Sequence, residues 1–160
     1  MTIDHHHVLI GEAVQRIAGI ARKYNGNSDW AYSKRKGNFP ANTDKCNKFV
    51  YDVTKEAGAE ALVQGSNGKL RPPLAGEWAN PRVKIPNWEV LPPAESPEPG
   101  DVAAYPLRGN PNFTGHSGIV TSVDANGNVR AIAAHANVVG PDDKFQHVQG
   151  VTFRRYTGGK

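Results

Sequence analysis

The single cysteine and two of the six histidines are the residues best suited to covalent chemistry. Cys46 can act as a nucleophile if its thiol pKa is lowered or if a base lies next to it. Imidazole is the side chain most often used as such a base. His116 and His135 lie in a region that reads as β-strands. A nucleophile, a base and a polar residue that orients the base together permit acyl transfer.

A single cysteine also limits the alternatives. It excludes an intramolecular disulfide and a zinc site built from several thiolates. The other role open to Cys46 is that of a small buried hydrophobe, which is common for a free cysteine. Cysteine-based acyl transfer needs no metal and no other cofactor, and we expect none.

The residues around Cys46 predict that it lies in the first turn of a helix. This helix is expected to start near residues 42–44, with Thr43 as N-cap, and to end near Gly58. A helix N-terminus carries partial positive charge and free N–H groups, which favour a thiolate, and Lys45 adds a further positive charge. The apolar stripe of this helix consists of Phe49, Val50, Val53 and Ala57. A structural cysteine would more naturally lie on that stripe.

The pair Asn126-Gly127 predicts a β-hairpin that brings His116 close to a second polar side chain. A two-residue turn at this pair places His116 opposite Asn137, with His135 as the diagonal neighbour on the same face. His116 is therefore the candidate base. We expect His135 to orient it, with Asn137 as the alternative third residue.

The remaining pattern predicts an α+β domain. A first helix is expected over residues 8–24, ahead of the helix that carries Cys46. A long proline-rich segment, residues 63–100, is expected to hold one helical turn around 74–80. Short strands then follow and indicate an antiparallel sheet, over residues 101–105, 116–124, 129–138 and 150–156.

Length and composition indicate one globular domain. The chain has 160 residues, of which 38% are hydrophobic and 21% charged. We expect a single catalytic domain over residues 1–160, with 1–7 as a flexible N-terminal tail. Its N-terminal helices, one of them bearing Cys46, are expected to pack on the antiparallel sheet of a monomer.

The charge balance indicates the kind of partner. The net charge of +4 and the isoelectric point of about 9.3 favour an anionic partner, which is a nucleic acid, lipid head groups or an acidic cell-wall polymer, and the alternative is a charge that serves solubility alone. The densest basic cluster, residues 34–36, is too short for a nucleic-acid arm, so no nucleic-acid partner is expected. No segment resembles a membrane span or a signal peptide. We therefore expect synthesis in the cytoplasm and no insertion into membranes.

Four short motifs in order resemble the NlpC and CHAP-type cysteine peptidases. They are DKCNKFV at 44–50, PGDVA at 99–103, GHSGIV at 115–120 and AHA at 134–136. In that superfamily they correspond to the nucleophile helix, the strand before the catalytic histidine, the histidine strand and the strand with the third polar residue. The resemblance covers roughly residues 30–139, except for the middle loop.

The resemblance implies a papain-like α+β fold and hydrolysis of an amide or peptide bond in peptidoglycan. Cys46 would be the nucleophile, His116 the base and His135 or Asn137 the third residue. The chain departs from many relatives in having Asn47, rather than Ser, after the cysteine. Many relatives also carry a tyrosine upstream of the cysteine, and Tyr32 is the nearest match.

The candidate substrate-binding residues are Tyr32, Arg71 and Trp78. The last two belong to the proline-rich segment, which is rigid and aromatic and would form a wall of the cleft. The alternative is that this segment is a packed cover without a role in substrate binding. The expected substrate is the peptidoglycan stem peptide or cross-link, which is short, branched and anionic.

The small basic domain also resembles amidase effectors that type VI secretion systems inject into rival bacteria. Such an antibacterial toxin would act in the periplasm or cell wall of a target cell, and a cognate immunity protein would plug its cleft. A phage lysin and a general cysteine protease are alternatives. A non-catalytic cell-wall or protein-binding module with an inert, buried Cys46 is the alternative outside enzymes.

Overall fold

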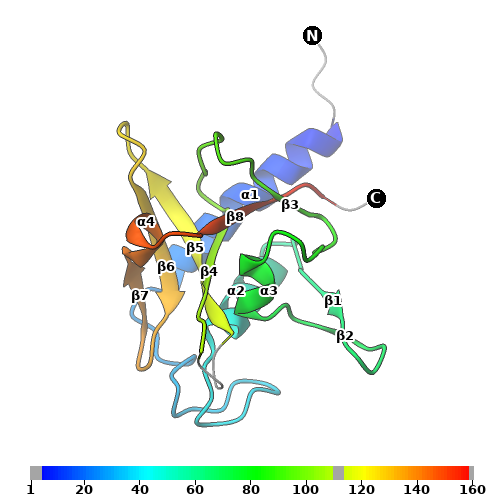
Figure 1. Cartoon of the computed structure of the whole chain (residues 1–160), viewed down its shortest axis with the longest axis vertical. Coiled ribbons are helices and arrows are strands. Elements are labelled where there is room, and N and C mark those ends of the chain that lie inside the picture. Colours follow the sequence, from blue (N-terminus) through cyan, green and yellow to red (C-terminus); the bar gives the residue numbers. More distant parts are fainter. Residues whose placement is uncertain (1–4, 110–113, 159–160) are drawn as a thin grey trace.

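The structure of the chain, a computed structural model, describes residues 5–109 and 114–158 (Figure 1). The helices are α1 (His5–Lys23), α2 (Cys46–Glu56), α3 (Ala75–Ala79) and α4 (Lys144–His147). The strands are β1 (Val63–Gln64), β2 (Leu70–Arg71), β3 (Trp88–Val90), β4 (Val102–Pro106), β5 (Gly115–Val123), β6 (Val129–Ala134), β7 (Val139–Asp142) and β8 (Thr152–Tyr156). Residues 5–7 belong to α1 rather than to the expected tail, and residues 1–4 lie outside the described ranges.

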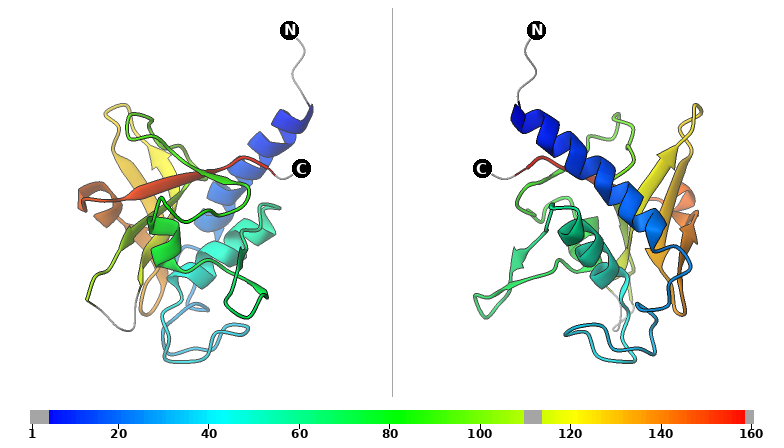
Figure 2. Two further views of the ribbon diagram at one scale, coloured as in Figure 1. Left: turned by 45° about the vertical axis from the view of Figure 1, so that its right-hand side comes forward. Right: turned by 180° about the vertical axis from the view of Figure 1, so that it is seen from behind.

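Six strands form one antiparallel sheet in the order β3-β8-β4-β5-β6-β7. Strands β1 and β2 pair with each other in a separate hairpin that projects away from the sheet. Seen from behind, helices α1 and α2 lie on the near side of the molecule (Figure 2), and both share the larger core with the sheet. The α+β class is therefore confirmed, with the Cys46 helix packed on an antiparallel sheet.

Alternating side chains give the sheet an apolar layer on each face. Val102 and Ile119 belong to the larger core, which also contains Ile17 of α1 and Phe49 of α2. Phe145 of α4 belongs to a second cluster, which further contains Ala103, Tyr105, Val120, Val129, Ala131 and Ala133. The helices on one face and α4 on the other thus bury both sides of β4, β5 and β6.

The hairpin between β5 and β6 has a different register from the one expected. Ile119 pairs with Ile132, and the register shifts between Val120 and Ser122. The turn is wider than two residues because the carboxylate of Asp124 accepts hydrogen bonds from the backbone N–H groups of residues 126 and 128. If the pairing of Ile119 with Ile132 is extended to the start of β5, His116 lies opposite residue 135 rather than residue 137.

The segment after β6 is also divided differently. The expected single strand over residues 129–138 is wrong, because the chain turns back after β6 and forms β7. The N–H of His135 donates to the carbonyl of Val138 at 3.0 Å and closes this turn. In the proline-rich segment, the expected helical turn is confirmed as α3, whereas the edge strand β3 was not predicted.

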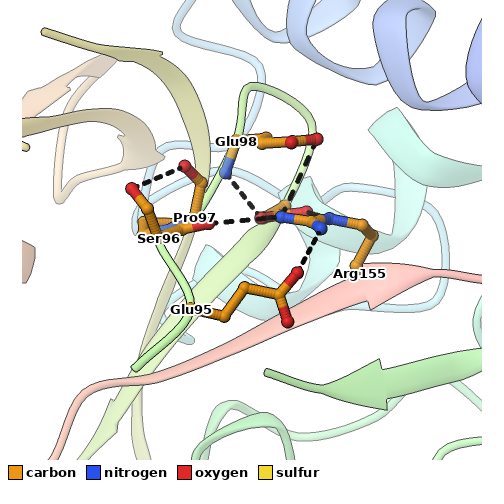
Figure 3. Close-up of polar contacts among 6 residues, drawn as sticks. Glu95, Ser96, Pro97, Glu98 and Arg155 are labelled. Carbon is orange, nitrogen blue, oxygen red and sulfur yellow. Dashed lines mark hydrogen bonds and ion pairs between the residues drawn. The ribbon is translucent and has the colours of Figure 1, made fainter. Parts of the chain in front are cut away.

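The Pro-Gly-Asp motif before β4 anchors the proline-rich segment to the sheet. Asp101 has no exposed surface, and its carboxylate forms two hydrogen bonds, 3.0 and 2.9 Å long, with the guanidinium of Arg155 on β8. Arg155 also contacts Glu95 and Glu98 of the preceding loop (Figure 3). This motif therefore has a structural role.

Gly100 of the same motif is required by its surroundings. Its φ is +99°, and a Cβ at this position would lie 2.2 Å from the carbonyl oxygen of Val14 in α1. Only glycine avoids both the strained backbone and the clash. The close approach holds the start of β4 against α1.

Candidate active site

Cys46 is the first residue of α2 and is only 1% exposed. Its thiol donates a hydrogen bond to Oδ2 of Asp44 at 3.3 Å, and its backbone N–H donates to Oδ1 of the same carboxylate, also at 3.3 Å. Burial and the charge of Asp44 raise the thiol pKa to about 12, although the neighbouring polar groups of Ser117 act in the opposite direction. The thiol is therefore protonated in the free protein.

The start of α2 differs in detail from the expectation. Thr43 is not the N-cap, because its hydroxyl donates to the carbonyl of Pro40. The backbone N–H of Cys46 donates to the carboxylate of Asp44 instead. The N-cap position is Lys45, which makes no capping bond with its side chain. Its ammonium donates to the carbonyls of Tyr32 and Thr43. Burial lowers the pKa of this lysine.

His116 on β5 is hydrogen-bonded to Asp142 at the end of β7. The distance from Nε2 to Oδ2 is 2.7 Å, and Asp142 is 6% exposed. Burial raises the carboxyl pKa, but the hydrogen bonds from His116 and from the N–H of Lys144 prevail and hold it below its usual value. An ionised carboxylate can only accept, so Nε2 carries the proton and Nδ1 remains as the basic nitrogen.

The ring of His116 is also held by aromatic packing. It stacks on Phe145 of α4, with ring centroids 5.3 Å apart and an angle of 8° between the planes. Tyr105, its cross-strand partner on β4, lies 5.7 Å away by ring centroid. Packing and the carboxylate together give the imidazole one orientation.

His135 and Asn137 do not bond to His116. The ring of His135 lies 5.9 Å from that of His116, and its Nε2 lies 3.2 Å from the carbonyl of Pro141. Asn137 is exposed in the turn between β6 and β7. Sequence reasoning missed Asp142 because it treated this turn as strand. The available signal was Asn137 itself, since asparagine is common in turns.

Two adjoining pockets form a groove past the start of α2. One, of about 340 Å³, contains Asn47, Phe39, Pro40, Asn42, Thr43, Leu74, Ala75 and Thr114 in its lining. The other, of about 310 Å³, is lined by residues that include Lys45, Tyr105, Leu107, His116, His135, Asp142 and Lys144. Tyr32, Asp44 and Gly115 line both. The two pockets therefore adjoin at Tyr32, Asp44 and Gly115, and Cys46 itself is not among their lining residues.

The three candidate substrate-binding residues lie in different places. Tyr32 is 42% exposed and lines both pockets. Trp78 is 1% exposed and packs edge-on against Trp88 in the core. Arg71 forms an ion pair with Glu77 at 2.6 Å. Neither Trp78 nor Arg71 lines the groove. The proline-rich segment contributes Leu74 and Ala75 to the groove wall instead.

The same region contains a set of atoms that could hold a cation. Among the described residues, ligand atoms of His116, His135 and Asp142 lie within 4.8 Å of one another. Two imidazoles and a carboxylate are a donor set used for zinc. The direct hydrogen bond between His116 and Asp142 is also the arrangement of a base and its orienting residue, which needs no ion.

The fold and the site together define the class of protein: a buried cysteine at a helix N-terminus is hydrogen-bonded to Asp44, which lines the same pocket as a histidine–carboxylate pair on an antiparallel sheet. The model of the CHAP domain family matches residues 35–137, more than half of the chain, and the chain belongs to this family. The matched region contains Cys46 and His116, and Asp142 follows it. Searches of curated proteins and of solved structures returned no match.

Membership in this family indicates peptidoglycan hydrolase or amidase activity, and it confirms the resemblance seen in the sequence motifs. CHAP domains are typically cysteine hydrolases of this kind. Among the helices of the described residues, none combines the length and apolarity needed to cross a membrane.

Proposed function

We propose that this protein hydrolyses an amide or peptide bond in the stem peptide or cross-link of peptidoglycan through a thioester on Cys46. The observation that carries the proposal is the 2.7 Å hydrogen bond between His116 and Asp142 in a pocket that adjoins the cysteine. This bond leaves Nδ1 of His116 as a base, and the start of α2 places at the nucleophile the backbone N–H of Cys46, which donates to Asp44 in the free protein.

The proposed reaction has two stages. Nδ1 of His116 takes the thiol proton while sulfur attacks the scissile carbonyl, and the N–H of Cys46 receives the oxyanion. The tetrahedral intermediate collapses to a thioester when His116 returns the proton to the leaving amine. Water, deprotonated by His116, then attacks the thioester and releases the acid and the thiol. Asp142 holds the imidazole and stabilises its cationic form.

Digestion of purified sacculi tests this proposal. Wild type is expected to release stem-peptide fragments that mass spectrometry identifies, and Cys46→Ala to release none. The fragment masses also identify the bond. If wild type and Cys46→Ala give the same products, or if neither gives any, the proposed hydrolysis is wrong.

We propose further that the protein is a monomeric antibacterial effector delivered into the periplasm or cell wall of a target cell by a type VI system. The groove is exposed at Tyr32 and Leu74, so a cognate immunity protein could insert there. The charge of +4 suits an anionic wall polymer.

Expression in a Gram-negative host tests the effector proposal. Export to the periplasm is expected to lyse the cells, whereas the same protein retained in the cytoplasm and an exported Cys46→Ala variant are harmless. Harmless exported wild type contradicts the effector proposal. Lysis only when a holin is co-expressed favours a phage lysin.

One observation favours a second candidate, a binding module with an inert cysteine. Cys46 is 1% exposed, and burial and Asp44 raise its pKa to about 12. A binding module would retain sacculi in a pull-down without releasing fragments, and Cys46→Ala would bind equally well. Release of casein peptides by wild type but not by Cys46→Ala would indicate a general cysteine protease.

A further inference from the structure

The carboxylate of Asp44 occupies the place that the proposed reaction needs for the substrate. Its two oxygens accept the thiol and the backbone N–H of Cys46, each at 3.3 Å. In the reaction, that N–H must bind the developing oxyanion, and the sulfur must become a thiolate. A carboxylate that holds both donors opposes both steps.

The proposed mechanism does not use the two hydrogen bonds between Asp44 and Cys46. Among the described residues, no hydrogen bond joins the Cys46 thiol to His116. The thiol points its proton at Asp44 instead. A neighbouring negative charge disfavours the thiolate, which agrees with the raised pKa of this thiol. Asp44 must therefore turn away before Cys46 can transfer its proton to His116.

Asp44 lies in the groove without a direct ion-pair partner among the described residues, so a cation of the substrate could pair with it and move it. Its side chain is half-buried and lines both pockets, so it lies where the two halves of the groove meet. No ion pair to Asp44 is present among the described residues. The ammonium of neighbouring Lys45 bonds to the carbonyls of Tyr32 and Thr43 instead. Burial lowers the pKa of this lysine, and the charge of Asp44 raises it by less, but among the described residues no cation bonds directly to the carboxylate, so a cation that entered the groove could pair with it.

We propose that Asp44 is a specificity-determining gate that opens when a positively charged group of the substrate, next to the scissile bond, pairs with its carboxylate. The substrate class is a peptide with a free amino group at that position, such as a diamino acid residue whose side chain is not cross-linked. Pairing with this ammonium draws the carboxylate from Cys46 and frees the thiol and the N–H together. This inference rests on the proposed function, since it assigns the substrate of the same site.

Thiol alkylation tests the gate without any substrate. Asp44→Asn keeps an oxygen that can accept the Cys46 N–H but removes the charge, so alkylation by iodoacetamide at neutral pH is expected to be at least about tenfold faster than in wild type. Asp29→Asn, an exposed carboxylate outside the groove, is the matched control and is expected to leave the rate unchanged.

Asp44→Ser is a second variant, because serine can accept the same N–H at the start of a helix. Circular dichroism checks that each variant is folded. If folded Asp44→Asn and Asp44→Ser are both alkylated at the wild-type rate, Asp44 does not hold the thiol and the gate is wrong.

Paired peptides test the specificity. One stem peptide carries a free side-chain amino group next to the scissile bond, and its counterpart is acetylated there. Wild type is expected to have a kcat/KM about tenfold higher for the peptide with the free amino group than for the acetylated peptide, which is the usual contribution of a charged hydrogen bond. For Asp44→Asn, the kcat/KM values of the two peptides are expected to agree within about twofold. A preference that persists in Asp44→Asn overturns the assignment. If wild type cleaves neither peptide nor sacculi, the proposed function fails, while the alkylation rates still decide whether Asp44 gates the thiol.

Discussion

Two buried carboxylates at the ends of sheet strands have partners of different chemistry, Asp101 before β4 and Asp142 at the end of β7. Asp101, with no exposed surface, is bound by two hydrogen bonds to Arg155. Asp142, 6% exposed, is bound by His116. Burial raises the pKa of Asp101 in spite of Arg155, whereas the bonds to His116 and Lys144 hold the pKa of Asp142 below its usual value.

The difference lies in the partner. A guanidinium does not release its proton at any ordinary pH, so the pair at Asp101 can only hold chain segments together. An imidazole exchanges its proton near neutral pH, so the pair at Asp142 can take part in a reaction. Loss of the first pair should therefore reduce stability, and loss of the second should reduce activity.

The largest effect is expected from His116→Ala. Without its base the enzyme should lose roughly 10⁶-fold in kcat on a stem-peptide substrate, as a serine protease does when its triad histidine is removed. The variant also leaves the buried Asp142 without its imidazole partner, so the thermal midpoint should fall as well. Release of labelled fragments measures the first quantity and calorimetry the second. Activity within tenfold of wild type would remove His116 from the mechanism.

Arg155→Met should have the largest effect on stability. It leaves the buried Asp101 without its charged partner, although the backbone N–H of Glu98 still donates to the carboxylate. The loss of the charged partner costs about 3–5 kcal/mol of unfolding free energy. Urea denaturation measures the loss, and Arg130→Met, at an exposed position on β6, is the matched control with a change below about 0.5 kcal/mol. The kcat of the folded fraction should remain that of wild type. If the kcat of folded Arg155→Met falls as far as that of Asp142→Asn, the assignment of stability to the Asp101 pair and of activity to the Asp142 pair is wrong.

Asp142→Asn should reduce kcat by roughly 10²-fold or more, because the amide does not stabilise the imidazolium. Its effect on stability should depend on pH. The pKa of Asp142 is lowered in the folded protein, so its contribution is present above the unfolded-state value of about 4 and is lost as the pH falls through the folded value. Urea titrations of wild type and variant should therefore converge below about pH 4. A constant difference would mean that Asp142 is not ionised in the folded protein.

The smallest effect is expected from His135→Ala. The sequence predicts His135 as the orienting residue, but in the structure Asp142 makes that hydrogen bond. We expect kcat to fall by less than about fivefold, the effect of losing one neighbouring ring without a direct bond. Asn137→Ala, an exposed change in the same turn, is the control. A loss for His135→Ala as large as that for Asp142→Asn would restore His135 as the third residue.

Local patterns were sufficient for most of the elements. The helix with Cys46 in its first turn, the turn at α3 and strands β4, β5 and β8 follow from apolar periodicity and punctuating glycines and prolines. The hairpin register was wrong because Asp124 widens the turn and a bulge shifts the pairing by one residue. Strand β7 was missed because it contains Gly140 and Pro141, which are typical of turns rather than of strands.

By itself, the sequence determined the nucleophile and the base as candidates, the α+β class and the family, because these depend on residue types and on order along the chain. Only the tertiary structure decided that Asp142 holds His116, that Trp78 lies in the core and that Asp44 covers the thiol. The first two depend on strand pairing and packing between distant segments. The contact between Asp44 and Cys46 depends on the residue at which α2 begins. A shift of this start by one residue would change which side chain accepts the backbone N–H of Cys46.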